Sequence, residues 1–477
     1  MLLKIVGGKM KKRLGLLALT AVLTSVAYGA SIDHIQTYTP EYLGNQAQNG
    51  MINNASVYYN PAGIVNLEKG TYVHIGAQLA VGHEKMEYNS KDYKADLFQP
   101  IPNFAMYKVE DDSALYWTFG GIAGGGDLKY DDGVAGTAVI PDIVNGLLMG
   151  SGKTLEEIKA AGINTNGSSA EGKNLYAQTT LGKVWKINNK LSLSAAGRLV
   201  YGIRELKGDL YLNSNSIKLG EAHLDSERTA WGYGAQLGIN YQVNEKLNFA
   251  MRYDSRVRMD FEADANESKI KLSKLPIPGY SNLGDVGLGF SDFYPEYADG
   301  VKQRRDLPAI LAAGMSYKVT DNWTVALSGN YYFNKDAKMD RGASSLKLPV
   351  FDETGNPIGS KEIKSLEAKY DNGYEIAVGT EYRINPKWAV LGGVNYAYTG
   401  AKYTSYDDVE FALDSIMVGT GLKYNPDETS EWVFTVAHYF YDSEEGHFSE
   451  KYKGMGISNP EYSKSITAFG VGYTKRF

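Results

Sequence analysis

The sequence predicts an all-β fold, a transmembrane antiparallel β-barrel of about 14 strands with an N-terminal plug (hatch) in its lumen. Three observations predict it. The chain ends in an alternating strand, it begins with a secretory signal, and the segments between alternate in hydrophobicity and are joined by short polar turns. The predicted division is a signal peptide at 1–30, a plug at 31–69 and an outer-membrane barrel with long extracellular loops at 70–477.

The C-terminal strand carries its large apolar residues on one face. Phe469, Val471, Tyr473 and Phe477 share one parity, so a strand places them on the same side. Small or polar residues occupy the other face, except at Lys475. Many soluble strands alternate in this way too. With a terminal Phe477, however, the pattern is typical of the closing strand of a bacterial outer-membrane barrel, and it predicts recognition by the barrel-assembly machinery.

The N-terminus has the composition of a secretory signal peptide. Three bases at 11–13 precede an apolar run at 14–27, and small residues follow at 29–31. We expect cleavage after Gly29 or Ala30, and Met10 is an alternative start. Removing 1–30 takes away five of the 49 Lys and Arg residues and none of the 55 Asp and Glu residues, which leaves 44 bases and a net charge of −11. Such a charge argues against nucleic-acid binding.

Composition excludes several other classes of protein. The chain contains no Cys, so disulfides, thiol catalysis and zinc–thiolate sites are excluded. No apolar run of 18 residues follows the signal, so no transmembrane helix is expected. Gly152-Lys153-Thr154 lacks the first glycine of a phosphate-binding loop, the six His residues show no metal-ligand spacing, and no Gly-x-Ser-x-Gly elbow occurs. We therefore expect no enzyme activity, no cofactor and no metal.

The pattern of residues 70–477 predicts a series of β-hairpins. Six short polar turns, most of them flanked by aromatic residues as a membrane-interface girdle requires, lie at 109–113, 187–190, 243–246, 319–322, 384–387 and 425–430. The predicted strands are 70–82, 98–109, 114–124, 174–187, 190–204, 228–243, 246–262, 303–319, 322–335, 367–384, 387–401, 411–425, 430–442 and 464–477. Both ends lie on the short-turn, periplasmic side, and the opposite connections are expected to be mostly long. The longest, 125–173, contains two short amphipathic helices expected on the rim.

Charge predicts which face of two strands points inward. An Arg on the lipid face at the midplane costs about 2–4 kcal/mol, so arginine-bearing faces are expected to line the lumen. This test places the following side chains inside: Arg198, Arg204, Arg252, Asp254, Arg256, Arg258 and Asp260. It places Phe249, Met251, Tyr253, Val257, Met259 and Phe261 outside. The five arginines are candidates to bind a substrate carboxylate in a bidentate way. The alternative is a lumenal ion ladder with Asp254, Asp260 and Glu375.

A barrel of this size has a lumen too wide for its own side chains to fill. Residues 31–69 precede the first strand and show little alternation, so they are the candidate plug; a free periplasmic tail is the alternative. Within them lies Asn60-Pro61-Ala62, inside the segment 54–63. Other distinctive segments are Pro100–Asn103, Gly232–Tyr241, Tyr253–Arg258, Asp306–Ala309 and Gly379–Tyr382.

With these segments, the chain resembles the FadL/TodX-type (OMPP1-like) outer-membrane transporters of long-chain fatty acids and other hydrophobic compounds. Their hatch carries an Asn-Pro-Ala motif, which Asn60, Pro61 and Ala62 match. The resemblance covers nearly the whole mature chain, although the loops match poorly. It implies a monomeric, passive transporter whose partners are outer-membrane lipids and hydrophobic small molecules, either long-chain fatty acids or hydrocarbons.

The resemblance also implies a route. Apolar residues of the rim helices would collect ligand: Ile140, Ile143, Leu147, Leu148 and Met149. A shift of the plug around Asn60 would then release it through an inward kink of the third strand, for which Gly120 and Gly121 are candidates; close packing against the plug is the alternative reason for these glycines. A weakly selective porin and a surface adhesin or interaction barrel remain as other functions. A barrel phospholipase is disfavoured because no Ser/His constellation is recognisable.

Overall fold

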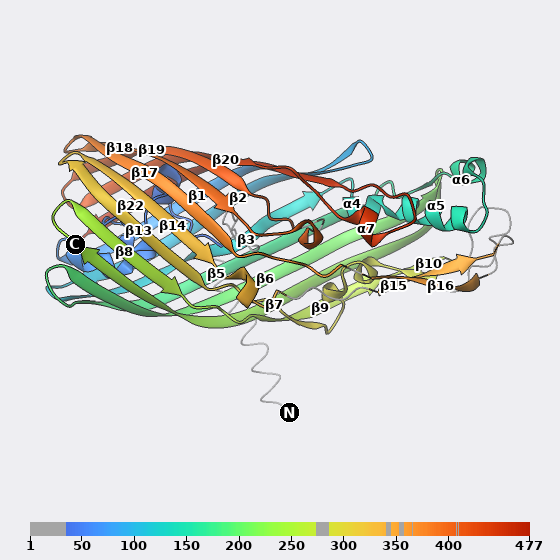
Figure 1. Ribbon diagram of the computed structural model, residues 1–477, viewed down its shortest axis with the longest axis horizontal. Coiled ribbons are helices and arrows are strands. Elements are labelled where there is room, and N and C mark those ends of the chain that lie inside the picture. The colour runs from blue at the N-terminus through green and yellow to red at the C-terminus, as the bar shows by residue number, and fades with distance from the viewer. Residues whose placement is uncertain are drawn as a thin grey trace, which may run out of the picture.

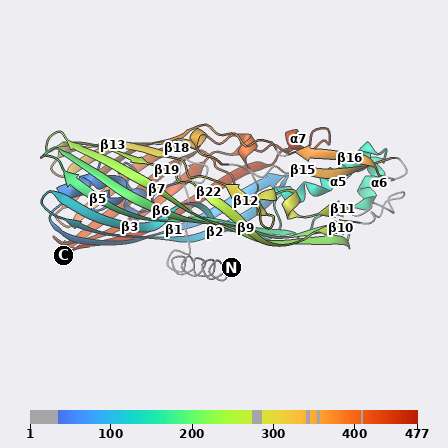
Figure 2. The ribbon, with the colours of Figure 1, turned by 90° about the horizontal axis from the view of Figure 1, so that it is seen from below.

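The computed structural model describes residues 35–272, 286–339, 345–352, 357–364, 366–406, 408 and 410–477. The predicted signal peptide lies outside the described residues. The described chain forms a long barrel whose one end carries short turns and the C-terminus, while the other carries small helices and hairpins (Figure 1). Figure 2 shows the same wall continuing well beyond the short-turn half.

The wall is a single closed antiparallel sheet. It contains 18 strands, and β22 pairs with β1 to close the ring. Setting aside the short β4 (Ile163–Asn164) and β21 (Glu444–Glu445), and joining two pairs that continue one another, gives the predicted 14 wall strands. These are β1 (Gly70–Tyr88), β2 (Lys91–Val109), β3 (Ser113–Tyr130), β5 (Ser169–Lys186), β6 (Leu191–Ser214), β7 (Ile217–Gln242), β8 (Leu247–Asp254) with β9 (Asp260–Ser268), β12 (Lys302–Arg304) with β13 (Ile310–Thr320), β14 (Trp323–Tyr332), β17 (Gly373–Asn385), β18 (Trp388–Tyr398), β19 (Ser415–Asp427), β20 (Ser430–Tyr441) and β22 (Glu461–Arg476).

Short helices and two hairpins complete the described chain. The hairpins are β10 (Ile270–Leu272) with β11 (Val286–Leu288) and β15 (Ser345–Phe351) with β16 (Pro357–Lys364). The α-helices are α2 (Pro40–Gly44), α3 (Ser56–Tyr59), α4 (Ala135–Ala138), α5 (Ile140–Gly150), α6 (Leu155–Ala161) and α7 (Phe448–Lys451). The 3-10 turns are η1 (Pro61–Asn66), η2 (Phe290–Asp292), η3 (Pro295–Tyr297), η4 (Asn334–Asp336) and η5 (Tyr403–Ser405). No described helix has the length and apolar character needed to cross a bilayer.

All six predicted short turns join neighbouring strands at one end of the barrel. At the other end the prediction was wrong for two connections, because β1–β2 and β6–β7 are joined by two-residue turns at 89–90 and 215–216. Asn89, Ser90 and Asn215 have φ values of 51°, 62° and 52°, which tight hairpin turns require. The segments 83–97 and 205–227, expected to be loops, are therefore continuations of the wall.

The polarity of the two faces explains this error. Near the short turns, apolar side chains of β6 such as Leu193 and Leu199 are exposed on the outer face, as a lipid-facing surface requires. Further along the same strand, Leu206 and Leu210 are buried in the interior, and polar residues face outward. The apolar face thus changes sides where the surrounding solvent changes from lipid to water. Such a change breaks the alternation that sequence patterning relies on.

A one-residue bulge overturns another prediction. β7 pairs with β8 at Gln236–Asp254 and with β9 at Thr229–Glu262. Seven residue steps along β7 therefore lie opposite eight steps along the β8–β9 side, which contains one extra residue. The extra residue inverts the facing beyond Asp254. Arg256 and Arg258 are consequently exposed on the outer surface, with Asp260, whereas Val257, Met259 and Phe261 are buried inside. Because these arginines follow an eight-residue strand, they lie near the outer edge of an apolar band about 25 Å tall rather than at its midplane.

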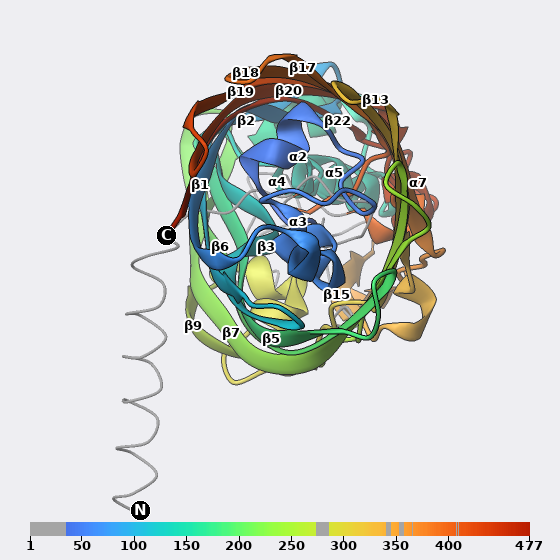
Figure 3. The same ribbon diagram turned by 90° about the vertical axis from the view of Figure 1, so that its left-hand side faces the viewer.

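Residues 35–66, called here the N-terminal segment, lie within the ring of strands (Figure 3). They are bound to several parts of the wall. The hydroxyl of Thr435 on β20 donates to the carbonyl of Pro40 at 2.8 Å, and Ser192 on β6 donates to that of Ala62 at 2.6 Å. On a third side, the amide of Asn49 donates to Ser328 of β14 at 3.0 Å. Hydrogen bonds on three sides hold the segment across the lumen.

Gly50 gives a direct test of this packing. A Cβ there would lie 2.4 Å from the backbone atoms of Met315 on β13, and the Gly50 carbonyl already accepts from Ser316 at 2.8 Å. We expect Gly50→Ala to lower the free energy of unfolding by about 1–3 kcal/mol, as overpacking does. Urea unfolding in detergent micelles measures this. Gly197→Ala is the control, since a Cβ there meets nothing within 4 Å; equal stability of the two variants would contradict the prediction.

Candidate functional site

The wall is interrupted between β2 and β3. These strands pair from Val109–Ala114 to Asn103–Gly120 and no further. Beyond that point residues 91–102 pair with β1 and residues 121–130 pair with β5, and no pair joins the two stretches, both of which are fully described. The barrel therefore has a place where neighbouring strands separate.

β3 is rich in glycine where it separates from β2. Two register shifts interrupt its pairing with β5, at Ile122 and at Gly125. Gly124 has a φ of 124°, and a Cβ there would lie 1.9 Å from the carbonyl oxygen of Asn174, so only glycine fits. Gly120 and Gly121, the residues singled out from sequence, stand where β3 leaves β2. The bulged stretch that follows them was not predicted.

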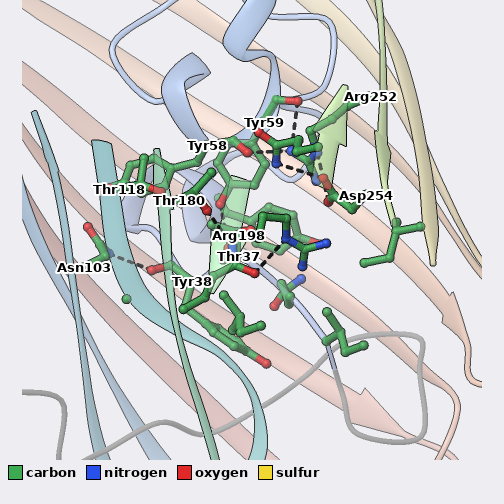
Figure 4. Close-up of a pocket in the computed structure, with 18 of the residues that line it drawn as sticks. Thr37, Tyr38, Tyr58, Tyr59, Asn103, Thr118, Thr180, Arg198, Arg252 and Asp254 are labelled. Atoms are coloured by element: carbon green, nitrogen blue, oxygen red, sulfur yellow. Dashed lines mark hydrogen bonds and ion pairs between the residues drawn. The ribbon is translucent and has the colours of Figure 1, made fainter. Parts of the chain in front are cut away.

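The N-terminal segment spans this interruption on the lumenal side. The amide of Gln36 donates to the carbonyl of Ile122 on β3 at 2.9 Å. The side-chain amide of Asn103 on β2 donates to the carbonyl of Tyr38 at 2.6 Å (Figure 4). Residues 36–38 thus connect the two strand edges that no longer pair with each other. Sequence reasoning noted Asn103 in a distinctive segment but gave it no role.

A largely enclosed cavity adjoins this contact. Its volume is about 60 Å³, and its lining includes Gly120, Gly121, Ile122, Arg198, Arg252 and Asp254 (Figure 4). Pockets that hold drug-sized ligands measure roughly 300–1,000 Å³. The cavity is therefore too small for a large apolar ligand unless the N-terminal segment moves.

Arg252 holds the N-terminal segment. Its Nη1 donates to the carbonyl oxygens of Tyr58 and Tyr59 at 2.5 and 3.0 Å, and its Nε contacts Asp254 at 3.2 Å (Figure 4). Both carbonyls lie at the end of α3, where a cation is favoured. The structure thus places this predicted ligand-binding residue in a contact between the wall and the segment.

Arg198 has a different environment. Its Nε donates to the side-chain oxygen of Gln178 at 2.9 Å, and its Nη1 donates to the carbonyl of Ser255 at 3.3 Å. Among the described residues, no carboxylate oxygen lies within 4 Å of its guanidinium. The charged residues that line the cavity are two arginines and Asp254, which gives the lining a net charge of +1. A buried cation with neutral partners favours an anion beside it.

The other predicted arginines are not part of this cavity. Arg204 faces the lumen six residues further along β6, where it pairs with Glu410. Arg256 and Arg258 are on the outer surface, so the prediction that they line the lumen was wrong. The five arginines therefore separate into two cavity residues, one residue higher in the lumen and two surface residues.

The rim residues are placed differently from the prediction of an exposed collecting surface. Ile140, Ile143 and Leu148 of α5 are only 2%, 3% and 1% exposed, because they pack into the apolar interior of the extracellular half. Leu147 packs against the same interior and is partly buried. Met149 alone of the five has a well-exposed side chain. The apolar stripe of this helix thus belongs to a folded core.

Asn60, Pro61 and Ala62 form the junction between α3 and η1. The Asn60 side-chain amide donates to Asn240 of β7 at 2.7 Å and to the carbonyl of Met51 at 3.2 Å. Pro61 opens η1, where its missing N–H removes no hydrogen bond. The motif therefore fixes the N-terminal segment to the β6–β7 side of the wall. Its role in gating remains a prediction.

Comparison with known proteins identifies the chain at family level. The model of the family described as outer membrane protein transport protein (OMPP1/FadL/TodX) matches residues 35–477. The chain belongs to this family. It is thus an outer-membrane β-barrel protein of the OMPP1/FadL/TodX family.

Characterised relatives in the family align over part of their length. The chain is 25% identical over 177 residues to outer membrane protein P1 of Haemophilus influenzae strain Rd, and 24% identical over 205 residues to the long-chain fatty acid transport protein of Salmonella typhi. These matches cover 37% of this chain, but only 31% and 45% of the two relatives. The chain thus spans less than half the length of either relative.

Solved structures share the family fold along nearly all of this chain. The toluene transporter TodX of Pseudomonas putida superposes with a TM-score of 0.63 and 15% identity, over 93% of this chain and 99% of TodX. A FadL homologue from Pseudomonas aeruginosa gives a TM-score of 0.63 and 12% identity over the same shares. At these identities the likeness shows the fold alone.

Proposed function

We propose that this protein takes up hydrophobic molecules passively across the outer membrane, and that its substrates are long-chain fatty acids. The names of its relatives cover both fatty-acid and toluene transport. Family membership therefore supports a hydrophobic substrate without choosing between a carboxylate and a hydrocarbon. The choice rests on the lumenal cavity.

Arg198 is the observation that favours a carboxylate. It lies beside the wall interruption in a cavity of net charge +1, with neutral hydrogen-bond partners. A fatty-acid carboxylate would supply the missing counter-charge and two acceptor oxygens in the geometry that a guanidinium fits. A toluene-like hydrocarbon would bring no charge and would leave the two buried arginines of the cavity sharing the single carboxylate of Asp254. The cavity chemistry thus supports an amphiphile with an anionic head.

The interruption between β2 and β3 supports lateral release into the membrane. An acyl chain gains about 0.8 kcal/mol per CH₂ that it buries, and a route through periplasmic water would lose that gain. In the described structure residues 36–38 cover the interruption. Release then requires the N-terminal segment to move, with the junction at Asn60, Pro61 and Ala62 as the point about which it shifts.

Uptake of radiolabelled palmitate tests the proposal. The gene is deleted, then complemented with wild type, with Asn60→Ala or with Asn166→Ala. We expect deletion to abolish uptake and wild type to restore it. Asn60→Ala should restore it poorly, because the side chain that fixes the segment to Asn240 is gone. Asn166, exposed at the far end of the barrel, is the control and should behave as wild type.

Other outcomes would favour the other functions. Unchanged palmitate uptake after deletion would overturn the proposal. Ion conduction in planar bilayers would then favour a porin. The N-terminal segment that lies across the lumen is an argument against an open porin channel. Loop-dependent binding to partner cells, with uptake unaffected, would favour an adhesin.

A further inference from the structure

The lipid-facing side of the wall has a hollow where two small residues lie side by side. The registers of the sheet place Met251 of β8, Ala313 of β13, Gly329 of β14 and Ile376 of β17 in one row across adjacent strands (Figure 1). Met251 and Ile376 are 47% and 53% exposed, so this row lies on the outer face. Ala313 and Gly329, between these two long side chains, leave the surface hollow.

Large side chains border the hollow along the strands as well. Toward the short turns, Met315 pairs with Leu327, and toward the extracellular end, Leu311 pairs with Tyr331. The hollow has a volume of about 510 Å³ and a predominantly apolar lining. An apolar space of this kind holds hydrocarbon in preference to water. It lies in the part of the wall that faces lipid, so its natural occupant is an acyl chain.

A row of tyrosines borders the hollow on its extracellular side. Tyr253 of β8 and Tyr331 of β14 flank Leu311, and Tyr374 of β17 pairs with Tyr331. Their side chains are 41%, 40% and 37% exposed. The hydroxyl of Tyr331 accepts a hydrogen bond from the side-chain amide of Asn372 at 2.9 Å. Tyrosines gather where the apolar band meets the lipid headgroups, so this row places the hollow in the outer leaflet.

Exposed cations lie at the extracellular ends of the same group of strands. Arg256 follows β8, and its Nη1 donates to the backbone carbonyl of Asp336, in the turn after β14, at 2.6 Å. Lys335 of that turn and Lys402, which follows β18, contact the carboxylate of Asp371 at 2.8 and 2.5 Å. The three cations are 46%, 57% and 42% exposed. They are called here the basic band.

The basic band can exchange its partners at low cost. One carboxylate, that of Asp371, holds two lysines, so this group of three keeps one positive charge. Asp336 and Lys338, close to them in the chain, carry opposite charges and offset each other. Ion pairs between exposed groups contribute little to stability, because water competes for both charges. A phosphate, with more acceptor oxygens than a carboxylate, therefore binds such a band favourably.

We propose that this face binds one molecule of the phosphorylated glycolipid of the outer leaflet, lipid A. A phosphate lies on the basic band, and an acyl chain crosses the level of the tyrosine row and enters the hollow at Ala313 and Gly329. The order of charge, tyrosines and hollow from outside inward matches the order of phosphate and acyl chain in such a lipid. A second copy of this chain fits less well, because a two-fold interface would set the basic band against its own copy.

Native mass spectrometry of the full-length protein tests the charged part of this inference. Delipidated protein in detergent micelles is titrated with phosphorylated lipid A or with the same lipid after enzymatic removal of its phosphates. Wild type is expected to bind one molecule of the phosphorylated form and to bind the other form more weakly. The triple variant Arg256→Gln, Lys335→Gln and Lys402→Gln should bind the phosphorylated form about 100-fold more weakly than wild type. It should bind the dephosphorylated form as wild type does.

Gly329→Leu tests the hollow. Among the described residues, a Cβ there meets the carbonyl oxygen of Glu375 at 3.5 Å, an ordinary contact, so the new side chain fills the hollow without strain. Lipid A affinity should fall about tenfold, the effect of losing roughly ten close atom contacts. Ala313→Leu fills the same hollow from the next strand and should act alike. Gly392→Leu on β18 is the matched control, since a Cβ there meets Thr380 at 3.7 Å and lies outside the hollow.

The control for charge removes three exposed lysines from the short turns at the opposite end: Lys190→Gln, Lys246→Gln and Lys387→Gln combined. It should bind lipid A as wild type does. Equal losses in this control and in the basic-band variant would overturn the inference, and so would equal losses in Gly392→Leu and Gly329→Leu. Failure of wild type to bind lipid A, or equal affinity for its two forms, would overturn it as well.

The same spectra distinguish a lipid from a second copy of the chain. Complexes of two barrels without lipid A, lost in Gly329→Leu, would assign this face to self-association and overturn the proposal. Heat-modified mobility on electrophoresis checks that every variant forms the barrel. None of these measurements involves transport, so their outcome is independent of the proposed function.

Discussion

Cells carrying Gln36→Cys together with Ile122→Cys are expected to lose palmitate uptake under oxidising conditions and to regain it on reduction. The backbone amide of Gln36 donates to the carbonyl of Ile122 at 2.9 Å, so the two introduced Cys residues would be neighbours, as a disulfide requires. The bond would fix the N-terminal segment to β3 across the wall interruption. If the segment must leave that place for a ligand to exit, uptake falls to the level of the deletion strain.

The chain is well suited to this measurement because it has no native Cys, so no other thiol competes. The Gln36 side chain makes no hydrogen bond within the described residues, and its replacement therefore breaks none. Each single-Cys variant should transport normally under both conditions. Normal uptake by the oxidised double variant, with the disulfide verified by mass spectrometry, would contradict both gating by the segment and release at this interruption.

Arg198→Gln is expected to weaken palmitate binding by about 10- to 100-fold. Hydrogen bonds to charged groups contribute about 1.5–3 kcal/mol, and each 1.4 kcal/mol is a factor of ten in affinity. Methyl palmitate, which carries no charge, should bind equally well to the variant and to wild type. Arg198→Lys should give an intermediate loss, because Lys keeps the charge but not the planar fork. Titration of the purified protein with both probes measures these differences.

The control for charge is Arg383→Gln, which removes one cation from an exposed position next to a short turn. It changes the net charge of the protein by the same amount without altering the lumen. Palmitate affinity should therefore equal that of wild type. An equal loss of palmitate and methyl palmitate in Arg198→Gln would show that the residue supports the shape of the cavity, and the assignment of a carboxylate-binding role would fail.

The fold was predictable where its determinants are local. Each short turn is encoded by a few adjacent residues; at Asn188, Asn244 and Asn385 the side-chain oxygen accepts from amides two and three residues ahead. Such bonds depend on neighbouring residues alone, so they are visible in the sequence. Together with alternation across the membrane, they sufficed to predict the strand number and the closed antiparallel sheet.

The site was less predictable because its contacts join distant residues. The bond between Gln36 and Ile122 and the bond between Asn103 and Tyr38 have no local signature. The bulge after Asp254 adds one residue, which period-two reasoning cannot anticipate, and it moved Arg256 and Arg258 to the outer surface. The charge rule nevertheless placed Arg198 and Arg252 inside, because their strands run without interruption through the apolar band.

The exchange of apolar faces along β6 has a thermodynamic consequence. Near the short turns, the exposed apolar side chains already face lipid. Unfolding within the bilayer would leave them in lipid and would expose little apolar surface to water. In the other half, unfolding would expose Leu206, Leu210 and the buried part of α5 to water, which raises the heat capacity. The free energy of unfolding of the extracellular half should therefore curve with temperature, as in a soluble protein. That of the half near the short turns should depend mainly on the surrounding lipid. One continuous sheet would thus join two regions with separate thermal responses.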